Sequence, residues 1–450
     1  MIRTLRFPEN LYTDVREEEV YSTRIIYENG TLKQNKQKCD RGALIRIFDG
    51  KRWYYSATTE TGRIQEAVDE LARLAAPDAA ILDHPVIGRL EVNQDTILKF
   101  ADPASDVRSV PRAEKLVLLQ SYLPVIDHHK EIVNALAIYL DNHTVKQFVS
   151  SLGTDVTFDY QSSAVVIRYD LKVQDKPASG VEYVMSADFK DLADHQGKFE
   201  ATLAKDIDFA ARATPVVPGQ YTCIMAPVVT GVFAHESFGH KSEADFMVGD
   251  ATMKKEWALG TRVGSEILSI VDTGLLAGNG YVPYDDEGCR AKETYLIKNG
   301  ILTGRLHSSQ TAAALDENPT GNARAVNFEF EPIVRMTTTY ICGGTLTKED
   351  LIAGTPLGIL IEDLKHGSGM TTFTIAPSRA WMIRDGKVTE PVEISVITGN
   401  VMETLHEIDA ISKDVKFLSF PLGGCGKMEQ APLRVGFGGA YIRANGINVR

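Results

Sequence analysis

The sequence predicts an α+β protein with two parts: an N-terminal antiparallel sheet with helices, and a C-terminal β-rich part that forms a curved sheet or partial barrel. Only eight of the 36 glycines precede residue 214 and 28 follow it, so the halves differ in turn content. In the first half strand patterns alternate with helix patterns, whereas the second half is a series of short strands joined by turns. The prolines at 215 and 218 exclude a continuous helix there, which places the boundary between residues 1–213 and 214–450.

Turn dipeptides and alternating apolar residues predict the strands of the first half. Asn29-Gly30 and Asp49-Gly50 accept the positive φ angles that tight hairpins need, and apolar segments flank both. These flanking strands and the later ones are expected at 24–27, from 32 onwards, 43–48, 53–56, 135–140, 144–149, 164–173 and 182–185. Helices are expected at 64–75, 116–123 and about 188–212. This order favours an antiparallel sheet covered by helices.

The second half opens with an apolar strand at 221–229, and Thr230 could cap the helix that follows. Asn299-Gly300 and Asp385-Gly386 predict further hairpins. Other strands are expected at 334–342, 371–375, 394–398 and 433–436. Many hairpins and few helices favour a strongly curved sheet or a partial barrel.

Composition and charge restrict the class of protein. A chain of 450 residues is longer than a single hydrophobic core usually supports, so at least two domains are expected. Apolar residues make up 44% and charged residues 24%, as in folded globular proteins. The net charge of −12 argues against nucleic-acid binding, and no apolar run is long enough to span a membrane. Five scattered cysteines without a C-x-x-C pair suit a cytoplasmic protein.

The clearest chemical signal lies at 231–245, where His235, Glu236 and His240 form an H-E-x-x-x-H pattern. Neutral imidazoles bind zinc well, and a carboxylate beside the first can take a proton from water. The common zinc-peptidase pattern, H-E-x-x-H, places both imidazoles on one helical face. Five residues correspond to about 140° on a regular helix. The helix must therefore form a π-bulge or end near Gly239 if both rings are to meet one metal.

A metal site needs a third ligand, and without one the pattern equally fits a helix with one packed and one solvated histidine. Glu243 lies three residues beyond His240 in the same segment. Cys425 lies between glycines that let the backbone approach closely, and Lys427 beside it would favour the thiolate. The residues alone leave the choice between Glu243 and Cys425 open.

Segment 235–245 and several distant segments together resemble the TldD/PmbA family of zinc metallopeptidases. The distant segments occur in the family's order: Asp285-Asp286-Glu287-Gly288, Asn299-Gly300-Ile301-Leu302, Pro319-Thr320-Gly321-Asn322 and Gly424-Cys425-Gly426-Lys427. The resemblance covers nearly the whole chain, and H-E-x-x-x-H is typical of the family's catalytic subunit. The resemblance implies that the peptide enters an enclosed channel, and two departures from the family pattern concern this channel. Glu429 stands where the family commonly has glycine, and the glycine run around His366 is incomplete.

The resemblance implies a catalytic Glu236, which would act as general base, and a metal-binding helix. Glu243 and Asp245 match the family pattern, and we expect them to orient an imidazole or brace the helix. The implied ligands of the Zn²⁺ ion are His235, His240 and Cys425.

The resemblance also implies a cytoplasmic homodimer, or a heterodimer with a related subunit, that hydrolyses unfolded or modified peptides. No nucleic acid or membrane is expected as a partner. A peptide bound as an added strand would be recognised by its backbone rather than by its sequence.

The alternative is a non-catalytic subunit that binds peptides or stabilises a partner and holds zinc only structurally. A scaffold would not need a carboxylate beside the first ligand, so Glu236 argues against it. The same site could also hydrolyse a non-peptide amide. The role of His366 stays open between a substrate contact and a solvated loop residue.

Overall fold

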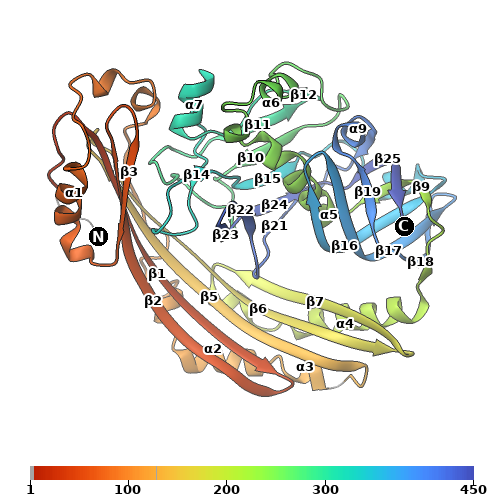
Figure 1. Cartoon of the computed structure of the whole chain (residues 1–450). Coiled ribbons are helices and arrows are strands. Elements are labelled where there is room, and N and C mark those ends of the chain that lie inside the picture. The colour runs from red at the N-terminus through yellow and green to blue at the C-terminus, as the bar shows by residue number, and fades with distance from the viewer. Residues whose placement is uncertain (1–4, 128) are drawn as a thin grey trace.

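The computed structural model describes residues 5–127 and 129–450 and shows an α+β protein (Figure 1). The long strands of the first half form one broad, curved sheet, drawn in red to yellow. The second half, drawn in green to blue, lies on the concave side of that sheet. The predicted fold class is confirmed.

The N-terminal sheet has the strand order β3-β2-β1-β5-β6-β4, and β7 pairs with β6. All neighbours are antiparallel except β4 and β6. Its strands are β1 (Tyr12–Glu28), β2 (Thr31–Phe48), β3 (Trp53–Thr58), β4 (Gln94–Ile97), β5 (Ile132–Ser150), β6 (Asp155–Val173) and β7 (Lys176–Ser186).

The strands of this sheet are much longer than the sequence predicts. The two strands expected at 135–140 and 144–149 are one strand, β5, whose 19 residues extend over roughly 60 Å at about 3.3 Å per residue. The polar residues Asp141, Asn142 and His143 continue the strand because β1 and β6 pair with it on both edges. Strand pairing therefore overrides the local polar pattern.

Helices cover the convex face of the N-terminal sheet. Odd-numbered residues of β1 such as Ile25 point to this face and pack with Leu119 and Phe199 from two of the helices. The helices are α1 (Ile64–Ala72), α2 (Arg112–Gln120), α3 (Pro124–Asp127) and α4 (Gln196–Arg212). The helix predicted over 188–212 is interrupted, because a 3-10 turn, Phe189–Leu192, precedes α4.

The second half contains a closed barrel. Strands β16, β9, β25, β19 and β17 are neighbours in that order, and β16 also pairs with β17, which closes the ring. Strands β18, β8 and β20 extend this sheet. The strands are β8 (Thr214–Pro215), β9 (Gly219–Met225), β16 (Leu357–Gly369), β17 (Thr372–Arg384), β18 (Lys387–Glu393), β19 (Ile397–Asn400), β20 (Ile408–Ile411) and β25 (Ile442–Val449).

A second sheet, of order β12-β11-β10-β15-β24-β21, lies beside the barrel. Its strands are β10 (Ile270–Thr273), β11 (Glu293–Lys298), β12 (Ile301–Leu302), β15 (Thr338–Ile341), β21 (Lys416–Leu418) and β24 (Gly436–Gly439). Two small hairpins complete the strands: β13 (Ala323–Arg324) with β14 (Ile333–Val334), and β22 (Cys425–Lys427) with β23 (Gln430–Leu433). The remaining helices are α5 (Pro227–Phe233), α6 (Ala251–Glu256), α7 (Ser309–Leu315), α8 (Lys348–Ala353) and α9 (Val401–His406).

Helix α5 lies between the barrel and the second sheet, where it packs against β16 and β24 (Figure 1). Its approach to β24 is close because both elements carry glycine at the contact. A Cβ atom on Gly231 would lie 2.5 Å from the backbone nitrogen of Gly438. The barrel core and α5 share one hydrophobic cluster, to which Phe233 contributes.

Buried ion pairs join the two halves. Lys146 on β5 lies 2.8 Å from Asp286, and Arg46 on β2 lies 3.1 Å from Glu287. Arg16 on β1 donates to the backbone oxygen of Asn327. The segment around Asp286 is thus held against the concave face of the N-terminal sheet. None of the described helices is long and apolar enough to cross a membrane.

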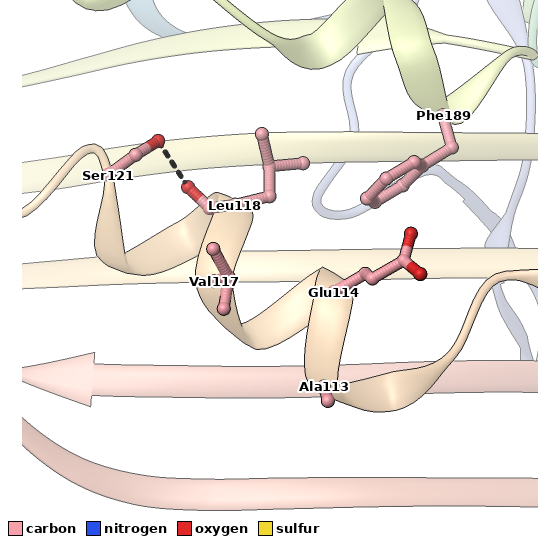
Figure 2. A pocket seen from close by; sticks show the side chains of 6 residues that line it. All are labelled: Ala113, Glu114, Val117, Leu118, Ser121 and Phe189. Atoms are coloured by element: carbon pink, nitrogen blue, oxygen red, sulfur yellow. Dashed lines mark hydrogen bonds between the residues drawn. The ribbon is translucent and has the colours of Figure 1, made fainter.

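A shallow hollow of about 450 Å³ lies on the helix-covered side of the N-terminal sheet (Figure 2). Its walls come from α2 and the turn before α4, and they are largely apolar. Glu114 is the lone ionisable residue among its lining residues, which are Ala113, Glu114, Val117, Leu118, Ser121 and Phe189. This hollow offers no group of residues that suggests chemistry.

Candidate active site

The H-E-x-x-x-H pattern lies on a π-helical segment. Strand β9 ends at Met225, α5 begins at Pro227, and α5 continues into the π-helix η6 (Ala234–Gly239). The N–H of His240 donates to the carbonyl of His235, five residues earlier. A π-helix is wider than an α-helix, so residues five apart come to the same side. The two imidazole centroids are 5.1 Å apart.

Two features of the sequence favour this local structure. A Cβ atom on Gly239 would overlap Sδ of Met336, so any side chain there would have to displace this buried methionine. A short 3-10 turn, His240–Ser242, follows directly and ends the helical segment. The structure thus contains the π-helical segment that the five-residue spacing predicts, and this segment ends at Gly239.

The structure brings His235, His240 and Cys425 together. One potential ligand atom from each residue lies within 4.8 Å of the others, and Glu243 is not part of this group. Nε2 of His240 lies 3.5 Å from Sγ of Cys425. Two imidazole nitrogens and a thiolate are a typical zinc donor set. Nδ1 of His235 is buried and has no hydrogen-bond partner among the described residues, so the protein leaves a nitrogen of this ring unsatisfied.

Cys425 and His240 favour each other's ionised forms. Burial opposes ionisation of the Cys425 thiol, but His235 and His240 stabilise the thiolate and lower its pKa to about 5. Burial likewise disfavours the His240 imidazolium, yet Cys425 and Glu243 raise its pKa to about 10. Lys427, which the sequence suggested would favour the thiolate, is not among the main causes of this shift.

Lys427 instead connects the cysteine loop, residues 421–427, to the helical segment. Its Nζ donates to both carboxylate oxygens of Asp245 at 2.7 Å and lies 2.9 Å from Oε2 of Glu243. The same Oε2 lies 3.1 Å from Nδ1 of His240. Burial raises the pKa of Glu243, but His240 and Lys427 outweigh it and lower that pKa overall. A carboxylate in this place orients the imidazole with Nε2 towards Cys425.

The cysteine loop is also held by the N-terminal sheet. Leu422 packs against a cluster on the concave face of that sheet, which includes Ile138 and Val166. Arg335, from the second half of the chain, donates to the backbone oxygen of Cys425 at 2.8 Å. Residues from both halves of the chain therefore position the thiolate.

A pocket of about 240 Å³ opens onto this cluster. Glu236 lies in its wall together with His235 and Cys425, so a carboxylate, an imidazole and a thiolate share one space. The pocket is bounded by α5, β16, the cysteine loop and β24. Its lining residues are Val232, His235, Glu236, Asn279, Leu364, Lys365, His366, Gly367, Phe420, Gly423, Gly424, Cys425, Arg434, Val435 and Phe437.

The structure corrects several local expectations. Thr230 does not cap a helix: it lies inside α5, and its hydroxyl donates to the carbonyl of Met225. His366 is not in a loop: it lies on β16 and lines the pocket. Glu429 is exposed in the turn between β22 and β23 and does not line the pocket.

Sequence reasoning missed Arg434 and Asn279. Both line the pocket, and Arg434 donates to the side-chain oxygen of Asn279. Neither residue belongs to a motif, and both come from loops far from residues 235–240 in the sequence. No pattern in the sequence would have singled them out.

Two imidazoles and a thiolate next to a carboxylate in a pocket are the groups of a metallopeptidase site. Comparison with known families agrees. A model of the PmbA/TldA metallopeptidase C-terminal domain matches residues 218–450, and a model of domain 1 of the same metallopeptidases matches residues 13–76. The chain belongs to the PmbA/TldD family of metallopeptidases.

The sequences of individual relatives align with nearly the whole chain. A metalloprotease of Synechocystis is 30% identical, with 97% of this chain and 94% of the relative covered. A protein of Saccharolobus solfataricus named zinc metalloprotease TldD homolog is 27% identical, with 97% and 96% covered.

Solved structures share the fold. A putative modulator of DNA gyrase from Thermotoga maritima superposes with a TM-score of 0.76 at 17% identity, covering 98% of this chain and 96% of that one. TldE from Thermococcus kodakarensis superposes with a TM-score of 0.74 at 16% identity, covering 97% and 96%. At such low identity these matches concern the fold alone.

Proposed function

We propose that the protein is a zinc-dependent peptidase that hydrolyses unfolded or modified peptides, with His235, His240 and Cys425 as ligands. The observation that carries this proposal is the convergence of these three donors, two of which, His235 and Cys425, line one pocket with Glu236. Three protein ligands leave a coordination position open, as in catalytic zinc sites. Bound zinc supplies Lewis-acid chemistry, which means polarisation of a carbonyl and acidification of water.

The residues of the chain then have separate tasks. The Glu236 carboxylate accepts a proton from the attacking water and passes it to the nitrogen of the leaving amine. Glu243 holds the His240 ring through Nδ1, and Lys427 fixes Glu243 and Asp245 relative to the cysteine loop. These interactions keep the donors in place before substrate binds.

We also propose that the peptide binds as an added strand. β16 pairs with β9 only as far as Ile361, whereas β16 continues to Gly369 and its residues 364–367 line the pocket. Within the described residues, no strand pairs with that edge of β16 beyond Ile361. Backbone hydrogen bonds along this edge would hold a flexible peptide of almost any sequence.

The proposal is tested by Glu236→Gln, which keeps the size of the side chain and removes its basicity. We expect zinc content to stay at the wild-type level and peptide cleavage, measured as kcat/KM, to fall about 100-fold or more, as for a lost general base. Glu429→Gln is the matched control, since Glu429 is exposed outside the pocket.

Wild-type cleavage by the Glu236→Gln protein would show that the assigned mechanism is wrong. Cys425→Ala is the companion variant and should lose zinc, while Cys39→Ala, at an exposed cysteine, should not. Undiminished zinc in Cys425→Ala would transfer the third-ligand role to Glu243. Tight peptide binding without new amino termini would favour the non-catalytic subunit.

The dimer and the cytoplasmic location stay predictions. We propose that the chain forms a homodimer or pairs with a related subunit. Native mass spectrometry combined with metal analysis would report both the number of chains per particle and the zinc per chain.

A further inference from the structure

Arg434 reaches from the second half of the chain into the wall of the pocket. It lies between β23 and β24, and its side chain crosses to the concave face of the N-terminal sheet. There the guanidinium donates to Oδ1 of Asn142 at 2.6 Å and to Oγ of Ser162 at 3.1 Å. It also donates to Oδ1 of Asn279 at 2.6 Å and lies 5.1 Å from the Tyr160 ring centroid.

The charge of Arg434 has no counterion among the residues that the structure describes. Its partners are neutral oxygens and an aromatic ring, and no carboxylate of the described residues lies within 4.0 Å. Burial lowers the pKa of Arg434, because desolvation disfavours the charged form, and Tyr160 opposes this only in part. A desolvated cation without a partner is costly, which is why buried charges are normally paired.

Two neighbouring buried arginines have a different setting. Arg324 donates to the backbone oxygens of Met336 and Arg434, and Arg335 donates to those of Gln430 and Cys425. Both tie backbone segments together, and neither lines the pocket. Arg434 alone among the three lies at the pocket, so its charge is available to a molecule bound there.

The side chain also has free hydrogen-bonding capacity. A guanidinium carries five N–H donors, and the bonds to Asn142, Ser162 and Asn279 use three of them. The N–H groups left on Nε and Nη1 can each donate a charge-assisted hydrogen bond to an oxygen of a bound carboxylate. Lys365 adds a second positive charge to the lining, whereas Glu236 is the one acidic residue in it.

We propose that Arg434 binds a carboxylate of the peptide substrate and makes the site selective for it. This inference rests on the proposed peptidase function and names the feature of the peptide that the pocket reads. The carboxylate belongs either to the carboxyl terminus, which would make the enzyme a carboxy-exopeptidase, or to an Asp or Glu side chain near the scissile bond. Backbone binding along β16 supplies affinity without sequence preference, and Arg434 adds the selectivity.

The test uses two matched peptide pairs with the zinc-loaded protein. One pair has the same sequence with a free carboxyl terminus or a terminal amide. The other pair is amidated and carries Glu or Gln beside the scissile bond. For wild type we expect kcat/KM to favour the carboxylate member of one pair by about tenfold or more, as for a charged hydrogen bond. The pair that shows the preference identifies the source of the carboxylate.

Arg434→Gln should bring the ratio of kcat/KM between the carboxylate peptide and its neutral counterpart close to one. Arg434→Lys should retain part of the wild-type ratio. Lys365→Met is the control for a cation in the same pocket and should keep the ratio. A fold defect lowers cleavage of both members alike, so the ratio separates recognition from stability. Equal rates within both wild-type pairs, an unchanged ratio in Arg434→Gln, or its complete loss in Lys365→Met would overturn the proposal.

Equilibrium binding of the same peptides to Glu236→Gln and to Glu236→Gln/Arg434→Gln separates this proposal from the peptidase function. Preferential binding of the carboxylate peptides that requires Arg434, without cleavage by wild type, would refute the peptidase and support Arg434. Cleavage of all four peptides at equal rates would support the peptidase function and refute the role of Arg434.

Discussion

Single residues decide the charge state of the candidate metal centre. In the metal-free protein a thiolate, Cys425, lies beside an imidazolium, His240, because each stabilises the ionised form of the other. Glu243 strengthens the imidazolium through Nδ1. The centre therefore stores one proton on His240 that a metal ion must displace, because only neutral imidazole binds metal.

Zinc binding should consequently release about one proton from His240 at pH 7.5 and also at pH 9. The pKa of His240, about 10, lies above both pH values, and that of Cys425, about 5, lies below both. Titration calorimetry in buffers of different ionisation enthalpy measures this number. An ordinary thiol with a pKa of about 8.5 and a neutral imidazole would release clearly less at pH 9 than at pH 7.5.

Glu243→Gln tests the orienting role of the carboxylate. The variant keeps a side-chain oxygen near His240 but removes its charge, so we expect zinc affinity to fall about 10- to 100-fold. Competition with a chelator of known affinity measures the change. The exposed Glu429→Gln variant should bind zinc as wild type does, and equal affinities in the two variants would contradict the assignment.

At the scale of elements, the π-helix η6 depends on how closely α5 packs against its neighbours. A methyl group on Gly231 would meet the backbone of Gly438 in β24, and one on Gly239 would have to displace the side chain of Met336. The histidines can share one side of the segment only while this packing holds the backbone in place. The position of the candidate ligands is therefore a property of the packed element.

Gly231→Ala should lower the free energy of unfolding by about 1–3 kcal/mol, the usual cost of overpacking. The added methyl group meets the backbone of Gly438, which cannot rotate away as a side chain can. Zinc affinity should fall as well, because α5 leads directly into His235. Gly197→Ala in α4 has open space around it and is the control, with unchanged or slightly higher stability. Denaturant unfolding and zinc titration measure both effects.

At the scale of the molecule, buried charges join the two halves. Burial disfavours the charge of Lys146, but Asp286 and Glu18 outweigh it and raise its pKa. Asp286 is buried too, and Arg16 and Lys146 lower its pKa to about 2. The stabilisation of the folded protein by the Asp286 carboxylate is fully present above the pKa of an unfolded aspartate, near 4. It is lost as the pH falls towards 2.

Lys146→Met would leave Asp286 and Glu18 without this partner. We expect a loss of about 3–5 kcal/mol in the free energy of unfolding, as when one member of a buried ion pair is removed. Lys205→Met removes an ion pair between a half-exposed lysine and Glu362 and should cost less than about 1 kcal/mol. Similar losses in the two variants, measured by chemical denaturation, would show that the buried network adds no special stability.

Sequence patterns determined the fold class, the curved β-rich second half and the need for a π-bulge or helix end near Gly239. These follow from local physics: glycine and asparagine favour tight turns, and a five-residue spacing does not fit a regular helix. The family resemblance also singled out Cys425, a residue that motif spacing alone left in competition with Glu243.

Tertiary structure alone decided how far the long strands extend, what ionises the thiolate and which residues complete the pocket. Polar residues such as Asp141 stay in a strand because neighbouring strands satisfy the backbone. His235 and His240 are the main groups that lower the pKa of Cys425, because packing places them at the sulfur. Arg434 reaches the pocket through contacts with residues almost 300 positions away, such as Asn142. Such long-range neighbours depend on how the sheets pack, which no local pattern encodes.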